Sequence, residues 1–139
     1  MRKFKTFLIF MTWIFKNNME KEFLSYEQAL ALKELGFDFE DYDILGFYSK
    51  KYGVTTHSQL TKNDGYNPAI IYQQAFRWFR EKYELHSTIT SISQESWQWH
   101  ITKPGESLGK LYDEDFYTYE EAELACLKKL IEITKRKIT

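Results

Sequence analysis

The side chains of this sequence that could do chemistry are few, and they lie far apart along the chain. The three histidines fall on different predicted elements and share no metal-ligand spacing with Cys126, the single cysteine. Cys126 falls on the apolar face of a predicted helix, where a thiol behaves as a small hydrophobic side chain and nothing local would stabilise a thiolate. The sequence therefore predicts neither a zinc site nor a nucleophilic cysteine. The histidines are His57, His86 and His100.

A cluster of carboxylates follows the first predicted helix and has the density of a calcium-binding loop. It comprises Asp38, Glu40, Asp41 and Asp43. A loop of the EF-hand type needs Gly at its sixth position and Glu at its twelfth, and here these positions hold Asp43 and Ser49. We therefore interpret the cluster as a solvated acidic turn and expect no bound metal.

Motifs of the common enzyme classes are missing from the sequence. No nucleophile elbow or glycine-rich phosphate loop occurs, and the glycines stand singly. We predict a protein that is not an enzyme and that uses no cofactor. An enzyme assembled from dispersed residues such as His86, His100 and Glu106 stays open as the alternative, because the members of a site need not be neighbours in sequence.

Basic and aromatic side chains interleave in two segments, as they do in proteins that bind single-stranded nucleic acid. The segments contain Arg77, Trp78, Phe79, Arg80 and Lys82, and then Trp97 and Trp99. Glu81 and Glu84 follow the two arginines at a spacing of four residues and can pair with them. Residues 1–18 hold four basic and no acidic side chains, so residues 19–139 carry a formal charge of −5, where the whole chain carries −1. This charge repels phosphate unless the basic C-terminal tail is segregated from it. An auxiliary nucleic-acid binder that uses this tail and the aromatic strand is therefore the alternative and not the leading hypothesis.

The N-terminus has the outline of a secretory signal, with basic residues before an apolar run from Phe7 to Phe15. Large aromatic side chains crowd the run, no cleavage motif of small residues follows, and the run is shorter than the roughly 20 residues of a membrane-spanning helix. We expect Met19 to be the natural start and residues 1–18 to be an upstream extension, in which case no membrane is involved. A membrane-directing segment stays open.

The elements that must position these side chains begin with three amphipathic helices in a chain with the length of one domain, residues 19–139. Their signals are a capping box at Ser25 and Gln28, a C-terminal Gly36, an N-cap and first-turn proline at Asn67 and Pro68, and a second capping box at Thr118 and Glu121. The middle helix is predicted to run to about Glu84. The first and last helices share a sequence pattern, which indicates either an ancestral duplication or two similarly capped helices.

Strands are expected at residues 42–49, with Gly46 as a bulge, and in a hairpin of residues 86–93 and 97–103 around Gln94 and Glu95. Residues 54–66 are expected to form a loop. Trp97, Trp99 and Ile101 share one face of the last strand, and Gln98, His100 and Thr102 share the other. The sequence thus predicts an α+β fold in which a small antiparallel sheet of about three strands packs against three helices, in the order α-β-α-β-β-α.

Three strings together resemble a family of small uncharacterised proteins that is common in phages and prophage-like elements of Bacteroidota. They are SYEQALALKELGFD at residues 25–38, YQQAFRWFREKY at residues 72–83 and YTYEEAELACLKKLI at residues 117–131. The resemblance spans roughly residues 22–137 and is weakest in residues 54–66 and in the hairpin. It implies a start near Met19 and a cytoplasmic accessory product of a mobile element, and it implies no functional residues.

A polar loop, an outward strand face and a basic tail are the surfaces that the predicted fold does not itself need. Their candidate binding residues are His57, Gln98, His100, Lys135, Arg136 and Lys137. We therefore predict a cytoplasmic, non-enzymatic accessory protein that acts by binding another protein.

Overall fold

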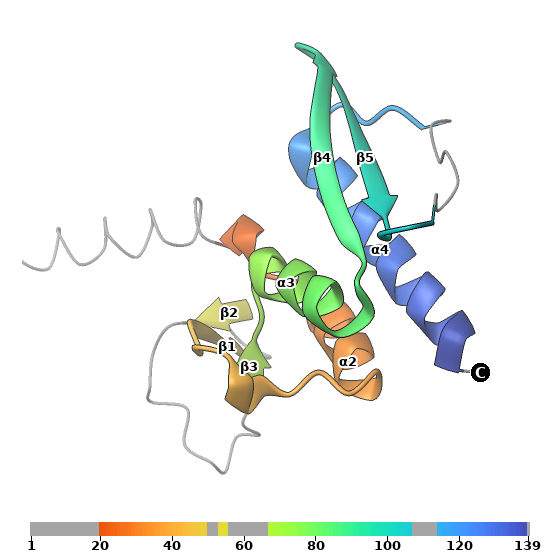
Figure 1. The fold of residues 1–139 in the computed structure, drawn as a ribbon. Helices are drawn as coiled ribbons and strands as arrows, with labels where there is room; N and C mark the ends of the chain where they lie inside the picture. Colours follow the sequence, from red (N-terminus) through yellow and green to blue (C-terminus); the bar gives the residue numbers. More distant parts are fainter. Residues whose placement is uncertain (1–19, 50–52, 56–66, 107–113, 139) are drawn as a thin grey trace, which may run out of the picture.

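The computed structural model describes residues 20–49, 53–55, 67–106 and 114–138, and Figure 1 shows their arrangement. The helices are α2 (Tyr26–Glu34), α3 (Tyr72–Tyr83) and α4 (Tyr119–Ile138), with the short 3-10 helices η2 (Glu20–Glu22) and η3 (Phe39–Asp41). The strands are β1 (Gly46–Ser49), β2 (Gly53–Thr55), β3 (Pro68–Ala69), β4 (His86–Ser93) and β5 (Ser96–Thr102). The α+β class is confirmed, and the order of elements matches roughly, with β1, β2 and β3 in place of one predicted strand before α3. The described strands form two antiparallel sheets, β2-β1-β3 and β4-β5, and do not join into one.

The ends of α2 lie where the sequence places them. Gln28 donates its backbone N–H to the Ser25 hydroxyl at 3.3 Å, and its side-chain oxygen accepts the Ser25 N–H at 3.1 Å, which completes the capping box. At the other end Gly36 adopts a φ of +91°. This left-handed turn lets the Phe37 N–H reach the Leu32 carbonyl at 2.9 Å, as in a Schellman motif. Both boundaries follow from local chemistry alone.

The start of α4 is also confirmed. Glu121 donates its N–H to the Thr118 hydroxyl at 3.2 Å, and its carboxylate accepts the N–H groups of Tyr117 and Thr118 at 3.1 and 3.4 Å. The negative charge of this carboxylate also suits the positive end of the helix dipole.

The predicted start of the middle helix at Asn67 is wrong. The Asn67 carbonyl accepts the N–H of Tyr48 at 2.8 Å, and Pro68 pairs with Phe47, so this segment extends as β3 along β1. Helix α3 begins four residues later, where the Gln74 side chain accepts the N–H of Ile71 at 3.2 Å. Proline fixes φ at a value that suits a strand edge as well as a first helical turn, and pairing with β1 decides between them.

The end of α3 near Glu84 is confirmed, but only one of its two predicted ion pairs forms. Arg77 contacts Glu81 at 2.7 Å. Glu84 leaves the helical conformation with a φ of +57°, and no ion pair joins it to Arg80 in the described residues.

Strand β1 is shorter than expected, because its pairing with β3 begins only at Gly46 and residues 42–45 are not part of a strand. Gly46 is paired with Ala69 and makes no bulge. A Cβ atom there would lie 3.1 Å from Val54 and 3.2 Å from the ring of Phe23, so glycine allows a close approach. Val54 and Thr55 form β2 and are not loop residues, whereas residues 56–66 lie outside the described part of the chain.

The hairpin of β4 and β5 matches its prediction closely. Trp99 pairs with Ile89, which extends the predicted apolar face of β5 onto β4, whereas Ile101 pairs with Ser87 and Trp97 pairs with Ser91. This face packs against α4, which lies alongside the hairpin in Figure 1. The outer edge of β5 is covered in part by Phe116, whose backbone exchanges two hydrogen bonds of 2.8 and 3.0 Å with Trp97.

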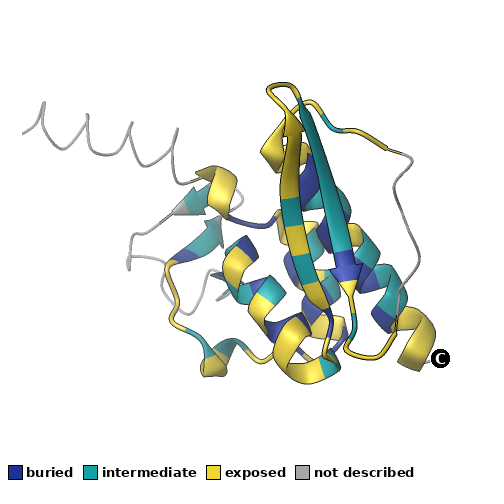
Figure 2. Ribbon diagram, turned by 45° about the horizontal axis from the view of Figure 1, so that its top comes forward, coloured by how far each residue is buried: buried dark blue, intermediate teal, exposed yellow. Residues whose placement is uncertain are grey.

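One hydrophobic core joins the three helices to the hairpin. Its buried members come from every one of these elements, and Figure 2 shows buried positions on the helices and on β5. They include Leu32 from α2, Ala75 and Phe79 from α3, and Leu127 and Leu130 from α4. The small β2-β1-β3 sheet joins this body through Tyr48, whose hydroxyl donates to the Leu24 carbonyl at 2.7 Å.

Candidate functional site

An apolar groove lies between the start of α2 and the strands β1 and β2. Its volume is about 620 Å³. Aromatic and aliphatic side chains make up most of its lining: Phe23, Tyr26, Tyr48, Val54, Tyr72 and Leu124. Concave apolar surfaces of this size, with a few polar groups at the edge, are where proteins bind ligands and partner side chains.

The groove continues along the exposed face of α2. A second hollow of about 270 Å³ shares Tyr26, Tyr48 and Asn67 with the first and extends to Leu30 and Phe39. Tyr26 is 51% exposed and Leu30 is 44% exposed, and at a spacing of four residues they lie on one face of the helix. We call the two hollows together the α2 groove.

The rings of the α2 groove are held in place by contacts beneath them. Tyr48 is fixed by its hydrogen bond to Leu24, and the Tyr26 ring meets it edge to face at 5.5 Å between centroids. Burial raises the pKa of both Tyr48 and Tyr72 to about 12, so these phenols stay neutral at physiological pH. These walls of the groove therefore offer apolar surface and neutral hydroxyl groups.

Carboxylates border the α2 groove at both ends. Glu20 lines the end next to β2, and Asp38 and Glu40 line the other, where Lys33 is the one basic lining residue among those described. The surrounding segment, residues 20–43, holds eight carboxylates and two lysines, a formal charge of −6. The predicted acidic turn thus borders an apolar surface.

A buried glutamate lies beside the groove. Glu123 is 6% exposed on the first turns of α4 and precedes the groove residue Leu124. Its pKa is raised to about 7, chiefly by burial and then by the negative charges of Glu22 and Glu120, while a hydrogen bond with Tyr119 acts in the opposite direction. The charge of this carboxyl group therefore changes near neutral pH.

The predicted binding residues do not form this groove. His57 lies outside the described residues, and none of the others lines either hollow. Gln98 donates from its side-chain nitrogen to Asp115 at 2.6 Å and so ties β5 to the segment before α4. His100 pairs with Thr88 across the hairpin, on the face turned away from α4.

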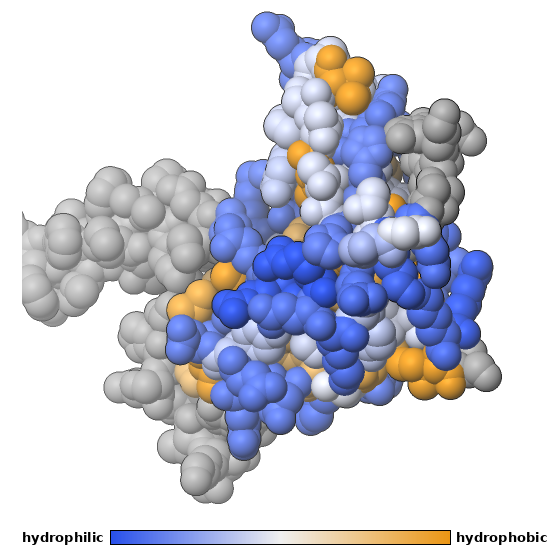
Figure 3. Space-filling view, viewed as in Figure 1, coloured by the Kyte–Doolittle hydropathy of each residue, from blue (hydrophilic) through white to orange (hydrophobic). Residues whose placement is uncertain are grey.

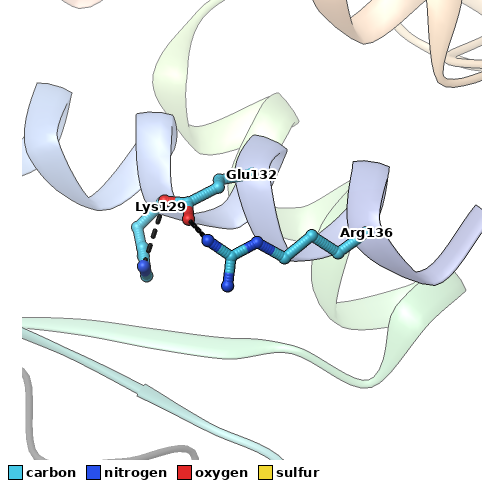
Figure 4. Close-up of polar contacts among 3 residues, drawn as sticks. All are labelled: Lys129, Glu132 and Arg136. Carbon is cyan, nitrogen blue, oxygen red and sulfur yellow. Dashed lines mark hydrogen bonds and ion pairs between the residues drawn. The ribbon is translucent and has the colours of Figure 1, made fainter. Parts of the chain in front are cut away.

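The basic tail forms the last turn of α4 and is partly neutralised there. Lys135, Arg136 and Lys137 are exposed. Glu132 contacts Arg136 through its carboxylate and accepts a hydrogen bond of 3.0 Å from Lys129 (Figure 4). The hydrogen bond from Lys129, followed by the charge of Arg136, holds the pKa of Glu132 below its ordinary value.

Several residues considered above for metal binding and catalysis take part in the packing and hydrogen bonding of the fold. Asp38 accepts the N–H of Glu40 at 2.9 Å and so caps η3. Cys126 is fully buried, and burial raises the pKa of its thiol to about 12. Glu106 lies 3.8 Å from Lys103, and within the described ranges no three potential metal ligands gather.

The α2 groove was not foreseen from the sequence, although one signal for it was present. The buried positions of α2 are Ala29 and Leu32, so Tyr26 and Leu30 are large apolar side chains that the core does not use. An amphipathic helix with apolar side chains on its solvent face indicates a second contact surface. The strands that complete the groove come from distant segments, and no local pattern places them there.

Compared with protein-family models, with curated proteins and with solved structures, the chain matches none of them. In the part of the chain that the structure describes, no helix combines the length and the hydrophobicity that crossing a bilayer requires.

Proposed function

We propose that this chain is a non-enzymatic accessory protein that acts by binding another protein, and that the α2 groove is its binding surface. The observation that carries the proposal is the pair Tyr26 and Leu30, two large side chains exposed over a preformed apolar hollow. Protein interfaces obtain most of their affinity from a few aromatic and aliphatic anchors of this kind. The fixed rings of Tyr48 and Tyr72 reduce the conformational entropy that binding would cost.

The cellular setting is a further part of the proposal. The resemblance of residues 25–38, 72–83 and 117–131 to proteins of phages and prophage-like elements supports a cytoplasmic accessory product of a mobile element. A protein that redirects or protects another protein needs a surface and no reactive group, which agrees with neutral phenols on the groove walls.

Nucleic-acid binding is supported less well. Trp97 packs edge to face on Tyr119 at 5.4 Å, and Trp99 packs against the core, so both rings have packing partners within the fold. The groove is bordered by carboxylates, which repel phosphate.

Site-specific photo-crosslinking tests the proposal. A photoreactive p-benzoylphenylalanine is placed at Tyr26 in the full chain and, as the control, at Ile92, which is 58% exposed at the far end of the hairpin. Irradiation of cells that make the protein should give a discrete protein adduct from position 26 and none from position 92. The substitution Leu30→Asp, in the same groove, should remove that adduct. Equal adducts from both positions, or an adduct insensitive to Leu30→Asp, would contradict the proposal.

A further inference from the structure

We infer that the α2 groove takes a basic, apolar peptide segment, in which lysine or arginine side chains flank aromatic or aliphatic ones. This inference rests on the proposed function and names the chemistry of the partner.

Carboxylates lie at both ends of the groove, and Lys33 lines only the end that holds Asp38 and Glu40. Glu20, Asp38 and Glu40 make no ion pair within the described residues. A Cβ atom at Gly53 would lie 3.3 Å from the Glu20 carboxylate, so this carboxylate stands over the backbone of β2 at the edge of the hollow. Each end of the groove thus presents negative charge next to apolar surface.

Negative charge extends beyond the residues that line the groove. Glu123 lies beside the groove, and the negative charges of Glu22 and Glu120 both raise its pKa. Three carboxylates are therefore close together near the Glu20 end of the groove. No cationic side chain contributes to this shift. A ligand that brings positive charge to this end would gain electrostatic energy, and an acidic ligand would lose it.

The elongated shape of the α2 groove also indicates which kind of ligand fits it. The two hollows of about 620 and 270 Å³ share Tyr26, Tyr48 and Asn67, so the groove is long and follows α2. Figure 3 shows hydrophobic surface next to β1 and β2, beside the hydrophilic surface of α3. An extended or helical segment with several apolar side chains in a row fits such a groove better than a compact ligand does.

The experiment measures binding of short labelled peptides to the full chain by fluorescence anisotropy, at low and at physiological salt. The probe alternates lysine with phenylalanine and leucine. One matched peptide has glutamate in place of each lysine, and another has alanine in place of each phenylalanine and leucine. We expect the probe to bind at least about tenfold more tightly than either matched peptide and to weaken as salt rises.

Variants of the protein locate the site. The double substitution Glu20→Gln and Glu40→Gln should weaken the probe by roughly three- to tenfold at low salt, whereas Glu95→Gln at the hairpin turn should change nothing. Tyr26→Asp should weaken the probe by at least about fivefold, and Ile92→Asp should not. Circular dichroism of each variant checks that it folds.

The outcomes separate this inference from the function on which it rests. If Tyr26→Asp weakens a peptide but the glutamate-containing peptide binds as well as the probe, the groove is a binding site and the basic partner is wrong. If the probe binds and Tyr26→Asp has no effect, the groove itself is wrong. Absence of probe binding, or occupation of the groove by a second copy of the chain in sedimentation equilibrium, also overturns the inference.

Discussion

At the scale of the single residue, Glu123 is a carboxyl group that the fold removes from water. Its carboxylate is buried on the first turns of α4, near Glu22 and Glu120, and its pKa is raised to about 7. A carboxyl group whose folded-state pKa exceeds its ordinary value binds its proton more tightly in the folded chain than in the unfolded one. The stabilisation from this proton is complete below pH 4.5, the ordinary value, and is lost as pH rises through about 7.

The substitution Glu123→Gln should remove this pH dependence. At pH 8 the wild-type carboxylate is charged and buried, so the neutral glutamine should raise the free energy of unfolding by about 1–3 kcal/mol. Below pH 4.5 the two proteins should have similar stability. Urea unfolding at a series of pH values measures both curves, and Glu95→Gln on the exposed hairpin turn serves as the charge control. Parallel curves for wild type and Glu123→Gln would contradict the proposed environment of Glu123.

At the scale of the element, α2 and α3 each end at a residue with a left-handed backbone conformation, and the energetic cost of this conformation differs between the two residues. Gly36 has a φ of +91° at the end of α2, and Glu84 has a φ of +57° at the end of α3. Glycine adopts this conformation without cost, whereas a residue with a Cβ atom loses about 1–2 kcal/mol. The molecule therefore carries one relaxed and one strained helix end.

Matched substitutions should show the difference. Gly36→Ala should destabilise the protein by about 1–2 kcal/mol, and its Cβ would meet only the flexible Lys82 side chain, at 3.2 Å. Glu84→Gly should stabilise it by up to about 1 kcal/mol. Glu84→Ala keeps the strain and should give no such gain, which makes it the control. Thermal unfolding followed by circular dichroism measures all three, and a loss of stability in Glu84→Gly would be the contrary result.

The elements also show how far a sequence predicts this fold. The caps at Ser25, Gly36 and Thr118 and the hairpin turn at Gln94 depend on residues a few positions apart, and all lie where the sequence places them. The start of α3 does not lie where the sequence places it, because Pro68 pairs with β1, a strand distant in the sequence. The α2 groove escaped prediction for the same reason, since Tyr26, Tyr48 and Tyr72 meet only after folding.

At the scale of the whole molecule, charge is divided between two ends. Residues 20–43 carry −6 around the α2 groove, whereas residues 128–137 at the end of α4 hold five basic side chains and one carboxylate. A single core lies between these ends, and it contains residues of all three helices and of the hairpin. The groove walls belong to elements that this core anchors, so the binding surface and the fold should be lost together.

This view predicts one cooperative unfolding transition, with Cys126 as a built-in probe. The thiol is fully buried, and burial raises its pKa to about 12, so it should not react with a thiol reagent while the protein is folded. Because Cys126 is the only cysteine, its labelling in a urea series reports the opening of the core alone. Its midpoint should coincide with that of circular dichroism, as two-state unfolding requires. Glu84→Gly should shift both midpoints upward together. Labelling at lower urea than the loss of helix would show that α4 separates from the hairpin before the helices unfold, and the single core would then be wrong.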